Sequence, residues 1–222
     1  MSTLNPLPPE SLKSFQFFFD AVKNTMGFVP NSMKTMARVP AILGSFSILS
    51  GTILADPEKA KPIVFLKLLF KQLGWSAKFM KNEERIPPSL RHMVSYVTSQ
   101  AAGCQYCQAH TFSNAHQSGL DIEKLKSIWE FETNDSYSNA ERAALRFGIA
   151  AGSTPNAVTE EHFTDLRKYF NENQIVELGA VISLFGFLNR WNDTFATQLE
   201  SEPVAIATQY LQDSGWEIGK HK

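Results

Sequence analysis

Two cysteines and a histidine lie at three-residue intervals near the middle of the chain, as Cys104, Cys107 and His110. The thiolate is the reactive form of cysteine, and a helix N-terminus stabilises it through unpaired backbone N–H groups and the helix dipole. A spacing of three along a helix places both sulfurs on one side, within about one turn. The spacing therefore predicts a pair that cycles between dithiol and disulfide.

His110 is expected on the same helical face as the two sulfurs. An imidazole can accept a thiol proton or stabilise a thiolate near neutral pH. The alternative is a pair of buried, inert cysteines, because free cysteine is among the residue types most often found inside proteins. Three convergent groups favour redox chemistry over that alternative.

Zinc binding is another interpretation of these residues. Cys104, Cys107, His110 and either His92 or His116 could supply four ligands. Closed zinc sites usually draw their second pair of ligands from a separate loop, whereas these residues lie on two adjoining predicted helices. We therefore expect no metal and no bound cofactor.

The remaining histidines carry no pattern that points to chemistry. His116 lies six residues after His110, nearly opposite on a helix of 3.6 residues per turn, so we expect it to face solvent or another subunit. His162 and His221 belong to no motif, and the sequence assigns them no role.

The elements that must position these residues are predicted to be helices. Apolar residues recur at three- and four-residue intervals between glycines, prolines and capping residues, and alternating strand patterns are missing. One helix is expected from Ser89 to Ala102, broken by Gly103, with Cys104 at the start of the next helix and Gly119 at its end. The sequence thus predicts an all-α fold.

Capping residues and glycines mark the other expected helices. Gly27 is expected to end the first helix in a left-handed conformation, and Gly74 to end a helix that starts at Pro57. A charged connector is expected from Trp75 to Pro88. Further starts are predicted at Ser11, Asn31, Pro40, Asp121, Ser138 with Glu141 as a capping box, and Asn171 with Gln174 as another.

Length and composition favour one compact domain. It is expected to comprise an N-terminal helical region and connector over 1–88, a core over 89–200 and a C-terminal tail over 201–222. The 21 basic and 22 acidic residues nearly cancel, which argues against a nucleic-acid partner. The most apolar stretch, 63–70, is far short of the roughly 20 residues that span a bilayer. With no secretory signal in view, we expect a cytoplasmic protein without a membrane partner.

A family resemblance rests on the segment from Ala102 to Thr111, which reads AGCQYCQAHT. This segment resembles the active site of AhpD-like alkylhydroperoxidases of the carboxymuconolactone decarboxylase family, and in particular of peroxidase-related members. Further matching segments occur in the expected order, at 27–31, Pro40, 139–145, 174–178 and 189–190.

The resemblance implies an AhpD-like helical fold with an extended N-terminal helical region and a homo-oligomeric assembly, as a dimer, trimer or hexamer. It implies a peroxidase that reduces hydrogen peroxide or small organic hydroperoxides and is reset by a dithiol protein or small-thiol reductant. Cys107 would be attacked by the peroxide to give a sulfenic acid, Cys104 would donate a proton and then resolve it as a disulfide, and His110 would relay protons.

Two departures from the family pattern affect this relay. The family's histidine lies four residues after the second cysteine, where this chain has Thr111, and His110 occupies the preceding position. The family's relay glutamate lies twelve residues before the first cysteine, where this chain has His92. His92 could replace that carboxylate through water, or it could be an ordinary structural histidine.

Two rival functions follow from the same fold. A lactone decarboxylase would match the name of the wider family, but it does not need a redox pair. A non-catalytic oligomeric or zinc-binding interaction protein would have kept the fold while losing the relay acid.

Overall fold

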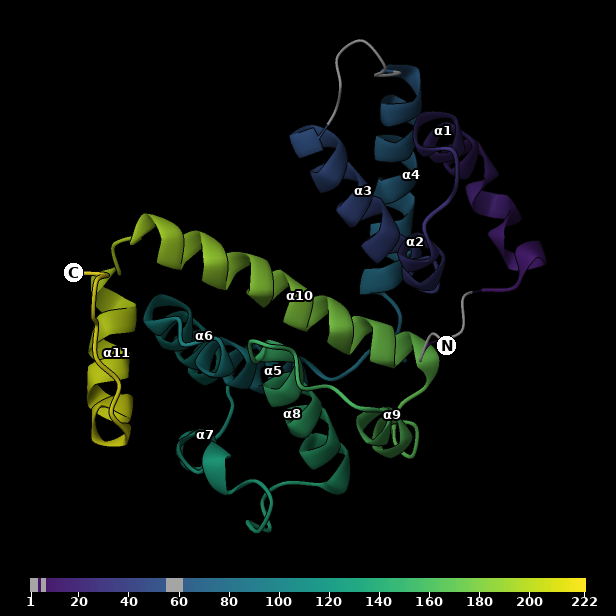
Figure 1. Cartoon of the computed structure of the whole chain (residues 1–222). Coiled ribbons are helices and arrows are strands. Elements are labelled where there is room, and N and C mark those ends of the chain that lie inside the picture. Colours follow the sequence, from purple (N-terminus) through teal and green to yellow (C-terminus); the bar gives the residue numbers. More distant parts are fainter. Residues whose placement is uncertain (1–3, 5–6, 55–61) are drawn as a thin grey trace. The chain divides into compact units, whose positions relative to one another are not determined.

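The computed structural model describes residue 4, residues 7–54 and residues 62–222, and this part of the chain contains helices and no strand (Figure 1). The predicted all-α fold class is confirmed. No helix within the described ranges is long and apolar enough to cross a membrane.

The chain divides into two compact units, and the domain limits expected from the sequence stay a prediction. The first unit comprises the described residues up to Arg85 together with Glu172–Glu177. Its core is built from phenylalanines of the first helices and aliphatic side chains of the next ones, including Phe15, Phe18 and Leu43. Its helices are η1 (Pro9–Phe15), α1 (Gln16–Met26), α2 (Asn31–Met36), α3 (Pro40–Leu54) and α4 (Pro62–Met80).

Helix α4 corrects the predicted stop at Gly74. The helix continues through this glycine to Met80, so the connector expected from Trp75 is shorter than predicted, and the expected start at Pro57 lies outside the described residues. The reason is packing of the residue that follows the glycine. The ring of Trp75 lies 5.3 Å from that of Phe15. Such contacts outweigh the helix cost of one glycine, about 1 kcal/mol.

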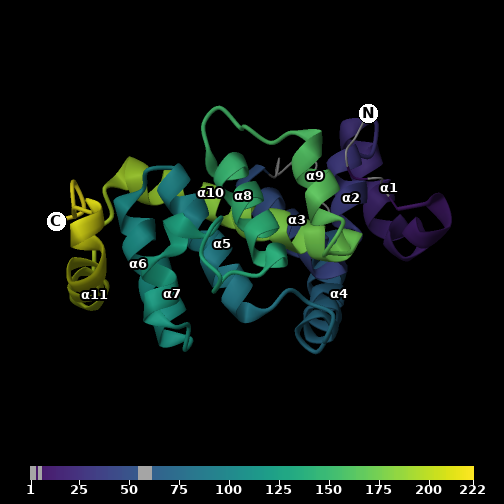
Figure 2. The ribbon, with the colours of Figure 1, turned by 90° about the horizontal axis from the view of Figure 1, so that it is seen from below.

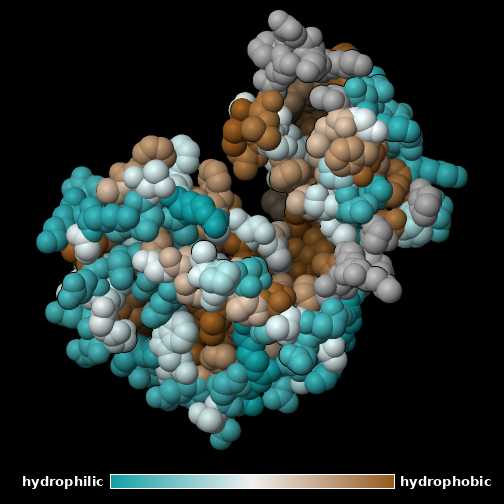
Figure 3. Space-filling model, viewed as in Figure 1, coloured by the Kyte–Doolittle hydropathy of each residue, from teal (hydrophilic) through white to brown (hydrophobic). Residues whose placement is uncertain are grey.

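Several large hydrophobic side chains of this first unit remain exposed. Figure 3 shows brown hydrophobic residues on α3, where Leu49, Ile53 and Leu54 are exposed. The second exposed group lies on α4 and includes Ile63, Phe70 and Leu73. Both groups lie outside the core formed by the phenylalanines.

The second unit comprises Ile86–Asn171 and Leu178–Lys222. Helix α5 packs against α6 on one side and α8 on the other, and α11 packs against α6 (Figures 1 and 2). Its helices are α5 (Pro88–Ala101), α6 (Gln105–Gln117), α7 (Ile122–Lys126), η2 (Ile128–Glu130), α8 (Asn139–Gly152), α9 (Glu160–Leu166), the greater part of α10 (Glu172–Phe195), α11 (Ser201–Leu211) and η3 (Gln212–Ser214).

The pairing of α5 with α8 depends on small residues. A Cβ atom on Gly152 would lie 2.9 Å from the backbone oxygen of Thr98, so only glycine permits this approach. The facing side of α5 carries the fully buried Met93, Val94 and Val97. Close packing therefore fixes α5, whose last turn leads directly to Cys104.

Local capping signals in the second unit are confirmed. Asp121 accepts hydrogen bonds from the backbone N–H groups of Glu123 and Lys124 at the start of α7. Ser138 and Glu141 form the predicted capping box at the start of α8. Such caps satisfy backbone donors that have no partner inside the helix.

We expect Ser138→Ala to lower the free energy of unfolding by about 1 kcal/mol, because the N3 amide of α8 loses its acceptor. Chemical denaturation of the full chain measures this change. Ser136→Ala, at an exposed position just before the cap, is the matched control. Equal denaturant concentrations at the unfolding midpoint for both variants and the parent chain would show that the cap contributes nothing to stability.

Candidate active site

Cys104 lies at the junction between α5 and α6. Gly103 adopts a left-handed conformation with φ 76°, which turns the chain after α5. Cys104 follows with extended backbone as the N-cap of α6, and its sulfur accepts a hydrogen bond from the backbone N–H of Cys107 at 3.4 Å. The predicted helix start at this cysteine is confirmed.

The two cysteines lie together as free, buried thiols, with Cys104 1% and Cys107 3% exposed. A hydrogen bond from the Cys107 thiol to the Cys104 sulfur lowers the pKa of Cys104 below its ordinary value, and backbone N–H donors act in the same direction. The same hydrogen bond, followed by burial, raises the pKa of Cys107 above its ordinary value. Cys104 is therefore the more acidic thiol of the pair.

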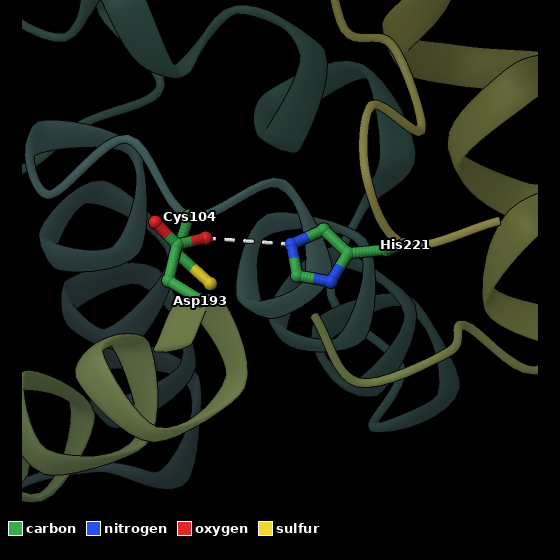
Figure 4. Close-up of side chains that lie close together, drawn as sticks. All are labelled: Cys104, Asp193 and His221. Carbon is green, nitrogen blue, oxygen red and sulfur yellow. Dashed lines mark ion pairs between the residues drawn. The ribbon is translucent and has the colours of Figure 1, made fainter. Parts of the chain in front are cut away.

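His221 brings an imidazole to Cys104. It belongs to the C-terminal segment, residues 215–222, which follows η3. Its Nδ1 lies 2.8 Å from the backbone oxygen of Thr197, which can only accept, so Nδ1 carries the proton and the neutral ring has its lone pair on Nε2. Cys104 Sγ, an Asp193 carboxylate oxygen and a ring nitrogen of His221 lie within 4.8 Å of one another (Figure 4). This arrangement places an imidazole and a carboxylate beside the acidic thiol.

The C-terminal segment is fixed over the start of α6 by a small set of hydrogen bonds. The indole N–H of Trp216 donates to the backbone oxygen of Gln105 at 3.1 Å. The backbone oxygen of His221 accepts from the N–H of Leu199 at 2.9 Å. Because Cys104 is buried and His221 of this segment lies beside it, we expect movement of the segment to increase access to the sulfur.

The third member of the predicted site, His110, points to a different partner. Its Nε2 lies 2.7 Å from a carboxylate oxygen of Glu200, and its ring lies 4.4 Å from that of Tyr106. The hydroxyl of Tyr106 donates to the other oxygen of Glu200 at 3.2 Å. His110 therefore ties α6 to the residue that precedes α11.

His92, the possible second relay, lies in the first part of α5 and is half-buried. Burial lowers its pKa, and the nearby Arg91 acts in the same direction. Among the described residues, its imidazole has no hydrogen bond to either cysteine or to His110. The structure therefore brings Cys104 and Cys107 together but does not join them to the expected histidine relay.

Asp193 and His221 are the site residues that sequence reasoning missed. Neither stands in a motif, and His221 is 117 positions from Cys104 by residue number. The described residues hold one group suited to a metal ion, and it combines these two with Cys104. The zinc alternative weighed from the sequence would instead have joined Cys104 to Cys107, His110 and either His92 or His116.

A cavity of about 1370 Å³ adjoins the site within the second unit. Asp193 and Lys220 line it, so it reaches the residues around Cys104. Asn189 also lines it and is only 4% exposed, yet neither polar atom of its amide has a hydrogen-bond partner among the described residues. The walls of the cavity include the aromatic side chains Phe147, Phe163, Phe187, Trp191 and Phe195.

Comparison with known proteins supports the family suggested by the motif. Residues 66–150 match the model of the carboxymuconolactone decarboxylase family. The chain is 27% identical over 131 residues to the uncharacterized protein YnjA of Escherichia coli, a match that covers 59% of this chain and 70% of YnjA. The resemblance predicted from the sequence is confirmed.

Solved structures extend the comparison over most of the chain. The debrominase Bmp8, as a cysteine-to-alanine variant in complex with 2,3,4-tribromopyrrole, is 28% identical with a TM-score of 0.56, covering 95% of this chain and 98% of Bmp8. An alkylhydroperoxidase AhpD core, from an uncharacterized peroxidase-related protein of Ralstonia eutropha, is 20% identical with a TM-score of 0.48, covering 89% and 88%.

We expect Trp216→Ala to raise the rate at which iodoacetamide alkylates Cys104 by at least about fivefold, because one hydrogen bond that holds the covering segment is lost. Peptide mass spectrometry at a fixed pH measures this rate. Trp129→Ala, which removes a partly exposed tryptophan elsewhere in the same unit, is the control. An unchanged rate in Trp216→Ala would show that the C-terminal segment does not limit access.

Proposed function

We propose that this chain, whose residues 66–150 match the model of the carboxymuconolactone decarboxylase family, is a thiol-dependent peroxidase-type oxidoreductase. Its substrates are hydrogen peroxide or small organic hydroperoxides. One observation carries the proposal: the sulfur of Cys104 lies at a helix start, receives a backbone hydrogen bond, and has a second thiol and an imidazole beside it.

In the first step, the thiolate of Cys104 attacks the terminal oxygen of the hydroperoxide. The S–O bond forms, the O–O bond breaks, and the alkoxide leaves as an alcohol after taking a proton. His221 is placed to supply that proton, because its Nε2 can first accept the thiol proton and then return it. Cys104 is now a sulfenic acid.

In the second step, the sulfur of Cys107 attacks the sulfenic sulfur of Cys104. A disulfide forms and the hydroxyl leaves as water, so the two thiols have supplied two electrons to the peroxide. An external dithiol protein or small thiol then reduces the disulfide by thiol exchange. The short separation along the first turn of α6 favours closure without a large backbone movement.

This order of attack reverses the roles that the family resemblance implies. The thiol of Cys107 acts as donor to Cys104, and its pKa is raised, so Cys107 is the poorer thiolate at neutral pH. The lowered pKa of Cys104 and the nearby Nε2 of His221 favour Cys104 as the nucleophile. His110, paired with Glu200, then ties α6 to the start of α11, and the relay role that the resemblance implies for it stays a prediction.

We expect Cys104→Ser and Cys107→Ser each to abolish dithiol-dependent turnover of peroxide, but only Cys107→Ser to accumulate a sulfenic acid after one equivalent. Dimedone labelling followed by mass spectrometry measures the sulfenic acid and identifies the cysteine that carries it. His221→Gln should slow the first step by about 100-fold, the usual contribution of a proton-transfer residue.

His116→Gln, in the same helix as the cysteines, is the matched control for loss of an imidazole. A sulfenic acid found on Cys107 in Cys104→Ser would restore the roles implied by the resemblance. Turnover that survives in both serine variants would reject the proposed peroxidase and leave the non-catalytic and decarboxylase alternatives.

Reductive debromination of a small aromatic compound is the second candidate. The observation that favours it is the match to Bmp8 over nearly the whole chain, together with the aromatic walls of the cavity beside Asp193. The thiolate of Cys104 would take the bromine, the ring carbon would take a proton, and Cys107 would displace bromide to form the same disulfide. Bromide release from tribromopyrrole with a dithiol, faster than peroxide turnover, would favour this candidate.

The assembly and the reductant remain proposals. An exposed row of neighbouring, mutually tilted rings runs along the end of α10, where the ring centroids of Phe187 and Trp191 lie 5.9 Å apart and those of Trp191 and Phe195 4.9 Å apart. Exposed aromatic side chains of this kind are enriched at protein interfaces. They support a homo-oligomer that buries this end of α10.

A further inference from the structure

We propose that Cys104, Asp193 and His221 bind a zinc ion in the reduced protein, and that this ion blocks the thiol until it is removed. The group joins three elements of the second unit: the first turn of α6, the last turn of α10 and the C-terminal segment (Figure 4). The site itself does not depend on which substrate is reduced, but its regulatory consequence rests on the proposed function.

The distances come close to those of a zinc site. With Zn–N, Zn–O and Zn–S bonds of about 2.0–2.3 Å in tetrahedral geometry, neighbouring ligand atoms lie about 3.3–3.6 Å apart. Nε2 of His221 and Oδ1 of Asp193 are already 3.4 Å apart. The sulfur of Cys104 lies within 4.8 Å of both ligand atoms, so it needs to move inward by little more than 1 Å, about one side-chain adjustment.

The imidazole of His221 is held as zinc ligands usually are. A ligating histidine normally donates its other ring N–H to a carbonyl or carboxylate, which fixes the tautomer and the ring orientation. Here Nδ1 donates to the backbone oxygen of Thr197. Nε2 lies 3.4 Å from Oδ1 of Asp193 but forms no hydrogen bond among the described residues, in a side chain only 1% exposed. A buried nitrogen without a hydrogen bond costs free energy unless something binds it.

The other two ligands also have supporting contacts. The backbone N–H of Cys107 donates to the sulfur of Cys104, which stabilises a metal-bound thiolate. Nζ of Lys220 lies 3.3 Å from Oδ2 of Asp193, so it orients the carboxylate and leaves Oδ1 for the ion. Two anionic ligands match the charge of Zn²⁺, and the lysine keeps the surroundings from becoming strongly negative.

The chemistry of the donors selects zinc over harder cations. Thiolate and imidazole ligands favour zinc, whereas calcium and magnesium prefer oxygen ligands throughout. Three protein ligands leave the fourth position for water, the pattern of an open zinc site rather than a closed structural one. Asp193 is 40% exposed, so the site faces solvent on the side of this ligand.

Metal binding and thiol oxidation exclude each other at Cys104. On binding, the sulfur gives a lone pair to the ion, any thiol proton goes to solvent, and no electron is transferred. On oxidation by peroxide, the same sulfur becomes bonded to oxygen and then to Cys107, so it ceases to be a ligand. Zinc is thus expected to protect the reduced pair, and formation of the disulfide to release the ion.

Cobalt(II) tests the site directly, because a bound thiolate gives it a charge-transfer absorption that needs no substrate. We expect the chelator-treated, reduced full chain to bind one equivalent. Asp193→Asn and His221→Gln should each weaken binding by about 100-fold, the share of one ligand in a zinc site. His116→Gln should bind like the parent chain, and zinc should displace cobalt from both.

Either of two outcomes would overturn the site: no absorption with the reduced parent chain, or equal cobalt affinity in the parent, Asp193→Asn and His221→Gln. Circular dichroism of each variant shows that it is folded, and the Lys220→Met variant gives a milder second test. We expect that variant to weaken binding by about tenfold, the usual effect of removing a contact behind a ligand.

The two proposals fail separately. Peroxide turnover measured in the presence of a chelator tests the thiol chemistry without the ion, whereas cobalt absorption tests the site without peroxide. Zinc added to the parent chain should slow alkylation of Cys104, and should not slow it in Asp193→Asn. Equal alkylation rates with and without zinc in the parent chain would reject the protective role.

Discussion

A sulfur at the first residue of a helix is the constraint on which the candidate site depends. Gly103 turns the chain out of α5 in a left-handed conformation, and Cys104 then caps α6 with its own side chain. The backbone N–H of Cys107 and the thiol of Cys107 both point to this sulfur, so its charged form is stabilised while the second thiol stays protonated. The lowered pKa of Cys104 and the raised pKa of Cys107 therefore have the same cause, the hydrogen bond between the two thiols.

The surrounding helices hold that junction in place and bring distant residues to it. The close approach of α8 at Gly152 fixes the end of α5, and the end of α10 supplies Asp193 and Asn192, whose amide lies 3.5 Å from the sulfur of Cys107. The C-terminal segment returns over α6 and delivers His221. The site is thus assembled from parts of the second unit that are far apart in the sequence.

The parts that sequence predicted are those governed by local rules. Gly103 before Cys104, the cap at Asp121 and the capping box at Ser138 each depend on a few neighbouring residues, and each is confirmed. Gly74 was misjudged because packing of Trp75 continues the helix, an effect that no local pattern records. His221 was missed for the same reason, since only the return of the chain over α6 brings it next to Cys104 and Asp193.

Titration of the two thiols tests the central claim most directly. Thiolate absorbance of the reduced, chelator-treated chain should rise in two separate steps, one below and one above the ordinary pKa of a cysteine, about 8.5. In Cys104→Ser the lower step should disappear, and the remaining Cys107 step should move down toward the ordinary value, because the hydrogen bond to the Cys104 sulfur that raises its pKa is lost. A single rise of both thiols near the ordinary value, unchanged in its lower part by Cys104→Ser, would contradict the account of an acidic sulfur held at the start of α6.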